Sequence, residues 1–295
     1  MVKPADVWSF RLLGVDIGVQ CTDSELLALV KANWGSTATV APQPDVMYSI
    51  TRINSGDGIL VTRSGAAPLM TANTGEFMYD LEKDLTMELQ RRRSDLFFLH
   101  AAAAEVRGRA CLLVAESGQG KSTTVWALLH HGFGYLSDEL APIDLSSMQV
   151  QAYPHALCLK RPGPAPYSSL PSGTLSTSHT LHVPIDFLPR VAQLESYSLA
   201  TIFFLSYVPS AAHPVIRSIS TGEASARLYA NALNQLAHPN AGLDAAVHIA
   251  QSVPCFRLDA AELSSTCTLI AATFNDVSDE VNGDPETPRR YSTSN

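Results

Sequence analysis

The sequence predicts an α/β protein with a small α+β domain at residues 1–94 and a larger α/β domain at residues 95–277. Strand-like alternation and one strongly amphipathic helical stretch occur in the first part. From Leu96 onwards, short apolar strands alternate with helical stretches, which is the pattern of an α/β domain. There, a glycine-rich turn follows a strand and precedes a helix, as in phosphate-binding α/β folds. Residues 278–295 are polar and without periodicity, which predicts a disordered tail.

The composition indicates a globular protein and argues against several classes of function. Of the 295 residues, 46% are hydrophobic and 16% are charged. No uncharged apolar run reaches the roughly 18 residues of a membrane span. The net charge of −8 argues against a broad surface for nucleic acid. Five cysteines are scattered without a CxxC pair, which suits a reducing cytosol. We therefore expect a cytoplasmic protein with no nucleic-acid or membrane partner.

The N-terminal elements follow from hydrophobic periodicity and from turn residues. Alternation of apolar residues over 13–19 predicts a half-buried strand. Thr22 and Glu25 have the spacing of a capping box, which predicts a helix that starts there. Strand-like runs at 46–53 and 59–62 flank a turn-rich segment and predict a hairpin. An amphipathic helix follows, whose apolar face carries Met78, Leu81, Leu85 and Leu89.

Short strands and helices continue through the second part. A hairpin is predicted at 96–106 and 110–115, and a helix from Lys121 to about residue 131. Further strands are expected at 135–136, 141–145, 150–153, 156–159, 200–208, 214–219 and 253–258, and helices at 222–237 and 260–274. Residues 162–184 hold five prolines, which predicts a long irregular loop of a kind that is usually functional or mobile.

The glycine-rich turn carries the strongest chemical signal. The P-loop pattern GxxxxGK[S/T] is met at Gly120, Lys121 and Ser122, with Ala115 at the position of the first glycine. In such a turn the backbone amides point at phosphates, Lys121 would bridge the β- and γ-phosphates, and the Ser122 hydroxyl would bind Mg²⁺. The residues expected to bind ATP are Glu116, Ser117, Gly118, Gln119, Gly120, Lys121, Ser122 and Thr123.

Two acids, Asp138 and Glu139, follow the next apolar strand. On residue type alone they would be solvated turn acids, but acids at a strand end beside a P-loop can hold Mg²⁺ or accept a proton from a hydroxyl. Their position therefore favours a functional role. His100 lies in an apolar strand-like run, where a lone histidine is more often a buried structural residue than a catalyst.

These features together resemble the HPr kinase/phosphorylase superfamily. The resemblance is carried by His100, the turn at 117–123, Gly132 at the helix end, and the acids at 137–139. It covers residues 96–160 well. It implies a P-loop kinase domain of the HPr kinase type, preceded here by the small α+β domain, and it allows a homo-oligomer because the family forms rings.

The resemblance assigns roles by position. Asp138 would be the base for the substrate serine, Glu139 an acidic residue of the Mg²⁺ site, and His100 the residue that orients or tunes Asp138. Lys160 looks like a basic residue that divergent relatives place beside the nucleotide. The catalytic candidates are then Asp138, His100 and Lys121, and the candidate ligands of Mg²⁺ are Ser122 and Glu139.

The sequence also departs from the family. Glu139 stands where the family has a second aspartate, and the motif with which HPr kinases engage their protein substrate, a glutamate with an Arg-Gly pair, is not found. The chain looks more like divergent HPr-kinase-related proteins, some of which phosphorylate a serine of precursor peptides such as those of lasso peptides. The resemblance therefore implies a peptide or protein acceptor other than HPr.

The function predicted from the sequence is transfer of the γ-phosphate of ATP, with Mg²⁺, to a serine hydroxyl of a peptide or protein. Two alternatives stay open. The chain could be a nucleotide-binding regulatory module without phosphotransfer, or a kinase of a small hydroxylated metabolite such as free serine. The 162–184 loop and the N-terminal domain could form either a peptide groove or a small pocket.

Overall fold

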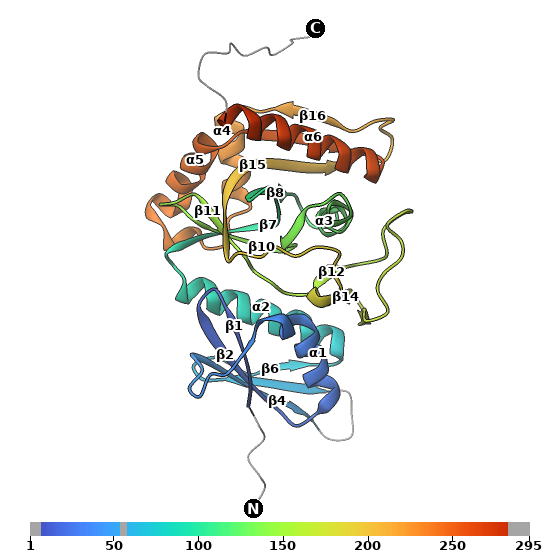
Figure 1. Cartoon of the computed structure of the whole chain (residues 1–295). Coiled ribbons are helices and arrows are strands. Elements are labelled where there is room, and N and C mark those ends of the chain that lie inside the picture. Colours follow the sequence, from blue (N-terminus) through green and yellow to red (C-terminus); the bar gives the residue numbers. More distant parts are fainter. Residues whose placement is uncertain (1–6, 54–57, 283–295) are drawn as a thin grey trace, which may run out of the picture.

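The computed structural model describes residues 7–53 and 58–282. In this part of the chain, the strands form three sheets of six, eight and three strands. Figure 1 shows the six-stranded sheet with helices α1 and α2 at one end of the molecule and the eight-stranded sheet with its helices at the other. The protein is thus a mixed α/β structure with several sheets. None of the helices in the described ranges combines the length and apolar character needed to span a membrane.

The N-terminal sheet has the strand order β3-β1-β2-β4-β5-β6. Its strands are β1 (Val7–Leu12), β2 (Val15–Cys21), β3 (Ala38–Thr39), β4 (Val46–Arg52), β5 (Ile59–Arg63) and β6 (Leu69–Thr71). The hairpin of β4 and β5 is confirmed as an antiparallel pair, although turn residues 54–57 lie outside the described residues. The strand expected over 13–19 is confirmed for residues 15–19, which belong to β2, but not for the two residues before them. Leu13 and Gly14 have positive φ values of 51° and 78°, so they turn the chain between β1 and β2.

Two helices cover this sheet. Asp23 is the N-cap of α1 (Ser24–Trp34), and its carboxylate accepts hydrogen bonds from the N–H groups of Glu25 and Leu26 at 3.0 and 3.1 Å. The capping box expected at Thr22 is therefore displaced by one residue, because a carboxylate both caps the amides and complements the helix dipole. The second helix, α2 (Thr74–Arg92), includes the predicted amphipathic stretch and buries its apolar face.

The eight-stranded sheet runs in the order β11-β10-β7-β8-β15-β17-β16, and β9 pairs with β7. Strand β8 lies antiparallel to β7 but parallel to β15, which is in turn parallel to β17. The strands are β7 (Leu96–Val106), β8 (Arg109–Val114), β9 (Gly134–Ser137), β10 (Leu140–Asp144), β11 (Gln149–Gln151), β15 (Ser196–Tyr207), β16 (Val215–Ser218) and β17 (Cys255–Ala260).

Four helices accompany this sheet, namely α3 (Lys121–His130), α4 (Thr221–Ala230), α5 (Leu243–Ser252) and α6 (Leu263–Asn282). Helix α5 was not predicted from the sequence, and its buried face consists mainly of alanines. Helix α6 continues to Asn282, so residues 278–282 are helical where a disordered tail was expected. Residues 283–295 lie outside the described residues.

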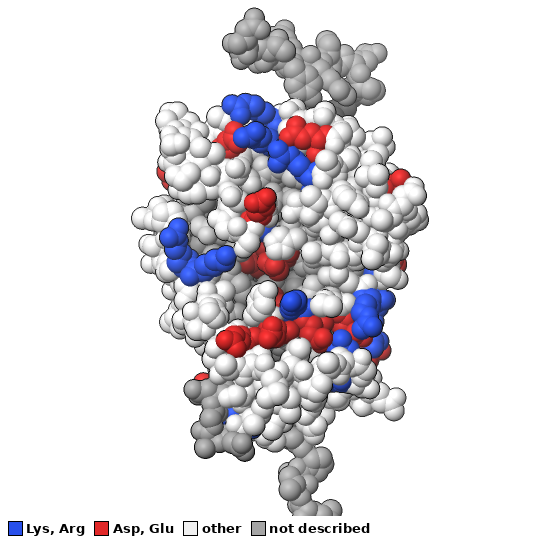
Figure 2. Space-filling model, turned by 180° about the vertical axis from the view of Figure 1, so that it is seen from behind, with Lys and Arg blue, Asp and Glu red and all other residues white. Residues whose placement is uncertain are grey.

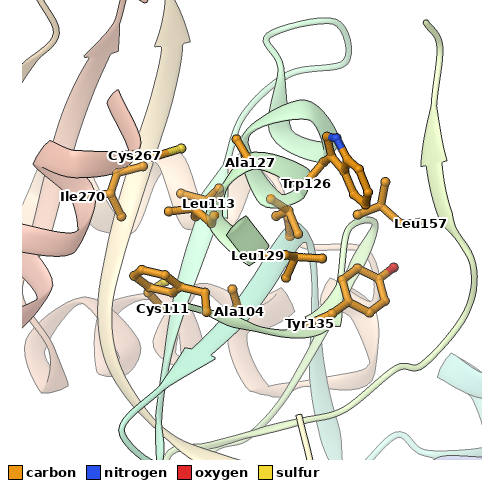
Figure 3. Close-up of a cluster of buried hydrophobic side chains, with 14 of the residues drawn as sticks. Ala104, Cys111, Leu113, Trp126, Ala127, Leu129, Tyr135, Leu157, Cys267 and Ile270 are labelled. Atoms are coloured by element: carbon orange, nitrogen blue, oxygen red, sulfur yellow. The ribbon is translucent and has the colours of Figure 1, made fainter. Parts of the chain in front are cut away.

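The main core lies where α3 and α6 pack on the eight-stranded sheet. Figure 3 shows Trp126 and Leu129 of α3 and Ile270 of α6 gathered with Leu113 of β8. A separate core lies under α4 and α5. The core of the N-terminal sheet also takes in buried side chains from the second part of the chain, which are Leu96, Phe98, Leu140 and Tyr153. The two parts of the molecule therefore share one apolar core.

The proline-rich segment at 162–184 is more ordered than expected. It contributes β13 (Leu175–Ser176) and β14 (Leu181–Val183), which form a small sheet with β12 (Leu157–Leu159). Tyr167 is buried, its carbonyl accepts a hydrogen bond from the Trp126 indole N–H at 2.9 Å, and its hydroxyl lies 2.6 Å from Nε2 of His131. The expectation of an irregular loop therefore holds for most of the segment, but it missed β13, β14 and the packing of Tyr167 on α3.

Candidate functional site

The glycine-rich turn, residues 115–120, joins β8 to α3 at the carboxyl end of β8. Gly118 and Gly120 have φ values of 89° and 94°, which L residues rarely adopt. Gly120 is also the N-cap of α3, and within the described part of the chain no side chain caps the amides of the first helical turn. Free amides at a helix start, together with the helix dipole, fit an anion such as phosphate.

Lys121 and His100 meet beside this turn. The Lys121 side chain is buried, its Nζ lies 2.7 Å from Nε2 of His100, and it donates a hydrogen bond to the Ala115 carbonyl at 2.6 Å. Burial lowers the pKa of Lys121, while Glu139 and Asp138 oppose that shift. Burial, and then the charge of Lys121, lower the pKa of His100 to about 4. A neutral His100 can therefore accept a hydrogen bond from the lysine.

The two predicted acids lie in different environments. Asp138 is 1% exposed; its Oδ1 accepts a hydrogen bond from the Tyr135 hydroxyl at 2.8 Å, and its Oδ2 accepts one from the Cys158 N–H at 3.0 Å. The Glu139 side chain is 51% exposed, and its Oε1 lies 3.2 Å from Nδ1 of His100. Partial burial and the neighbouring Asp138 raise the pKa of Glu139. The contacts of His100 therefore run to Lys121 and Glu139.

Further predicted residues surround the turn. Lys160, which follows β12, donates a hydrogen bond from Nζ to Ser117 Oγ at 3.1 Å. The Gln119 side-chain oxygen accepts a hydrogen bond from the Tyr207 N–H at 3.0 Å, which ties the turn to the end of β15. Glu116 is exposed, and Ser122 and Thr123 are half-buried at the start of α3. The structure thus brings distant parts of the chain to this turn.

The residues proposed for Mg²⁺ are oxygen donors, which is the chemistry that this ion prefers. Ser122 supplies a hydroxyl in the first turn of α3, and Glu139 supplies a half-exposed carboxylate. Over residues 7–53 and 58–282, no group of three or more His, Cys, Asp or Glu side chains could hold a metal ion. Mg²⁺ at nucleotide sites needs only one or two protein ligands beside phosphates and water, so the donor set fits an ion that arrives with the nucleotide.

Sequence reasoning missed two residues beside Asp138. His155 is 1% exposed, its Nε2 lies 3.4 Å from Asp138 Oδ1, and its Nδ1 lies 3.7 Å from Glu82 Oε1. Burial raises the pKa of Glu82 to about 7, and His155 opposes this. Neither residue belongs to a spacing motif. Glu82 lies beside the apolar stripe of α2, four residues after Met78 and three before Leu85, but its partner His155 is revealed only by the folded arrangement.

Charged side chains gather on the face that Figure 2 shows. A band of acidic side chains crosses this face at the height that α2 has in Figure 1, and further acidic and basic side chains lie above it. Helix α2 carries the acids Glu76, Asp80, Glu82, Asp84 and Glu88. Among these acids, Asp84 and Glu88 pair with Arg63 of β5, whereas Glu82 lies near His155 in the part of the molecule that holds Asp138.

Comparison with known proteins gives little further information. The sequence matches no known protein family, and no curated protein matches it. Among solved structures, the chain is similar to the Hpr(Ser) kinase/phosphatase from Coxiella burnetii, with 15% identity and a TM-score of 0.34. That similarity covers 63% of this chain and 99% of the other. A score this low leaves the function to be argued from the residues of the site.

Proposed function

We propose that the chain is an ATP-dependent kinase that transfers the γ-phosphate to a serine hydroxyl of a peptide or protein. The observation that carries the proposal is that His100 joins Lys121 of the glycine-rich turn to the acid Glu139, next to Asp138. Phosphoryl transfer requires mainly positioning and stabilisation of charge. A turn with free amides, a lysine and two acids supplies both.

Each residue would have a defined part in the transfer. The amides of the turn and the Lys121 ammonium would bind the triphosphate, with Lys160 beside Ser117. The serine oxygen would attack the γ-phosphorus, the bond from that phosphorus to the β,γ-bridging oxygen would break, and ADP would leave. Asp138 would take the hydroxyl proton, held in place by Tyr135 and the Cys158 N–H.

The ion and the acceptor place two demands on this site. Ser122 and Glu139 would hold Mg²⁺, which when bound neutralises negative charge on the β- and γ-phosphates. Because Asp138 is 1% exposed, the acceptor must displace neighbouring atoms before its hydroxyl reaches the carboxylate. Lids and loops often make such adjustments on substrate binding.

A second candidate function is a nucleotide-binding regulatory module without phosphotransfer. The burial of Asp138 favours it, because both carboxylate oxygens are already engaged within the protein. In that case Asp138 would tie β9 to β12 as a structural residue. Such a protein would bind MgATP through the same turn without passing phosphate to an acceptor.

The deciding experiment is mass spectrometry of acceptors after incubation with the full chain and MgATP. One sample contains a library of serine-containing peptides, a second contains free L-serine, and a calorimetric titration measures ATP binding. Gain of one phosphate on peptide serine supports the proposal. Phosphorylation of free serine alone makes the protein a metabolite kinase, binding without transfer makes it a regulatory module, and absence of ATP binding rejects all three.

A further inference from the structure

We propose that Glu82 of α2 and His155 are positioning residues for Asp138, so that the N-terminal part of the chain completes the candidate site. This inference rests on the proposed function for the role of Asp138, but the contacts themselves stand on geometry. Glu82 and His155 are far apart in sequence and belong to different parts of the molecule. Their meeting point is the carboxylate proposed as the base.

The three side chains form a row. The imidazole of His155 lies between the two carboxylates, with Nε2 3.4 Å from Asp138 Oδ1 and Nδ1 3.7 Å from Glu82 Oε1. Both ring nitrogens are buried, and neither has a hydrogen-bond partner with good geometry among the described atoms. The carboxylates are therefore the polar groups that the ring faces, at distances that a small shift would turn into hydrogen bonds.

The burial of the Asp138 carboxylate explains why polar side chains would be placed around it. A carboxylate that is 1% exposed is costly unless hydrogen-bond donors surround it. Tyr135 and the Cys158 N–H supply two donors, and His155 is the third polar group within reach. Glu82, on the far side of the ring, would determine which nitrogen of His155 carries the proton and how the ring is oriented.

Neighbouring contacts fix His155 against the N-terminal part. The Ala156 N–H donates a hydrogen bond to the Asn33 carbonyl of α1 at 2.8 Å. The Asn33 side-chain oxygen also lies 2.9 Å from Nδ1 of the buried His182 on β14. The ring of His155 packs edge-on against Tyr153, with centroids 5.0 Å apart. The segment that carries His155 is thus held by α1 on one side while its ring faces α2.

The test compares four single variants and one double variant of the full chain. Glu82→Gln and His155→Gln remove the proposed contacts, their combination tests whether the two act together, and Glu82→Asp is the conservative variant. Asp80→Asn is the matched control. It removes the same charge from α2, but a displacement of two residues turns it about 200° away from Glu82. Circular dichroism and thermal unfolding check that each variant is folded.

Two readouts are measured, the first on every folded variant and the second on the variants that keep His155. The first is phosphotransfer from MgATP to a peptide found in the screen described above, with kcat and the KM for ATP determined separately. The second is the pair of ring ¹⁵N resonances of His155 in protein labelled at histidine. We expect Glu82→Gln to lower kcat roughly tenfold or more and to leave the KM for ATP nearly unchanged. The double variant should be no slower than His155→Gln, and Glu82→Asp should recover part of the rate.

The resonances separate a positioning role from a merely structural one. Glu82→Gln should move the ¹⁵N shifts of His155, whereas Asp80→Asn should not. A fall in kcat of Glu82→Gln with unmoved His155 resonances overturns the inference, and so does a Glu82→Gln variant that behaves like the parent in both readouts. If the parent chain phosphorylates no acceptor, the proposed function fails. The His155 resonances of Glu82→Gln still decide whether Glu82 determines the proton position and orientation of the His155 ring.

Discussion

The side-chain nitrogen of Lys121 lies 2.7 Å from Nε2 of His100, and Nδ1 of the same ring lies 3.2 Å from Oε1 of Glu139. One imidazole therefore connects the cation of the glycine-rich turn to an acid on the neighbouring strand end. Because the pKa of His100 is lowered to about 4, the ring is neutral near pH 7 and has one acceptor and one donor nitrogen. Because Nε2 accepts a hydrogen bond from the lysine, the proton of the neutral ring is on Nδ1, which faces Glu139.

Replacement of Lys121 by alanine should abolish phosphotransfer. The γ-phosphate would lose its charge partner in the transition state, and the loss of rate should be roughly 100-fold or more. Lys83→Ala, on the exposed side of α2, is the matched control, and transfer from radiolabelled ATP is the measurement. Undiminished ATP turnover in a folded Lys121→Ala protein would refute the P-loop assignment.

Replacement of Asp138 by asparagine should leave ATP binding nearly intact and remove most of the transfer rate, by roughly 100-fold or more. Asparagine keeps the shape and one oxygen acceptor for Tyr135 or the Cys158 N–H, but it cannot take a proton. Glu139→Gln is the companion variant and should weaken nucleotide binding that depends on Mg²⁺. Calorimetry and initial rates separate the two effects. If instead Glu139→Gln loses transfer rate and Asp138→Asn loses nucleotide affinity, then Glu139 is the base and Asp138 the residue of the Mg²⁺ site.

Tyr167 should anchor the proline-rich segment to α3. Tyr167→Ala removes a buried aromatic side chain and should lower the free energy of unfolding by about 3 kcal/mol or more. Tyr167→Phe removes only the hydroxyl contact with His131 and should cost about 1 kcal/mol. Urea unfolding of both variants gives the comparison. Equal stability of the alanine variant and the parent would mean that this segment does not pack on α3.

His182 should make stability depend on pH. Burial lowers the pKa of this imidazole to about 4, from 6.5, so the folded protein binds fewer protons than the unfolded chain between these values. The stabilisation is complete above about pH 6.5 and is lost as the pH falls toward 4; His182 should contribute about 2 kcal/mol of the loss between pH 7.5 and pH 5. His182→Gln should flatten this dependence, whereas the exposed His248→Gln should not. The free energy of unfolding is measured by denaturant at the two pH values. If it falls by the same amount in His182→Gln as in the parent, His182 does not have this role.

Local patterns predicted the centre of the molecule well. The strand before the turn and the helix that starts at Lys121 were predictable because their signals lie within a few adjacent residues. Asp138 and Glu139 were selected for the same reason, from their position at a strand end. Their different exposures could not be predicted, because Tyr135 and the backbone of Cys158 bury one acid and not the other.

Interactions between distant residues were not predictable. Glu82 and His155 are 73 positions apart (155 − 82 = 73), and each looks ordinary in its local sequence. Strand β12 was expected at 156–159, but its partners β13 and β14 were hidden, because they are two and three residues long and lie in the proline-rich segment. The turn at Leu13 was missed because leucine rarely adopts the positive φ that it has there.

The apolar core that unites the N-terminal sheet with Leu96, Phe98, Leu140 and Tyr153 has a practical consequence. A fragment that starts near residue 95 would leave these side chains without their partners from the N-terminal sheet, on an apolar patch that invites aggregation. Because such a shared core couples the two parts, they should melt together in a single transition. The boundary that is visible in the sequence is therefore unsuitable as the start of a fragment that contains the candidate site alone.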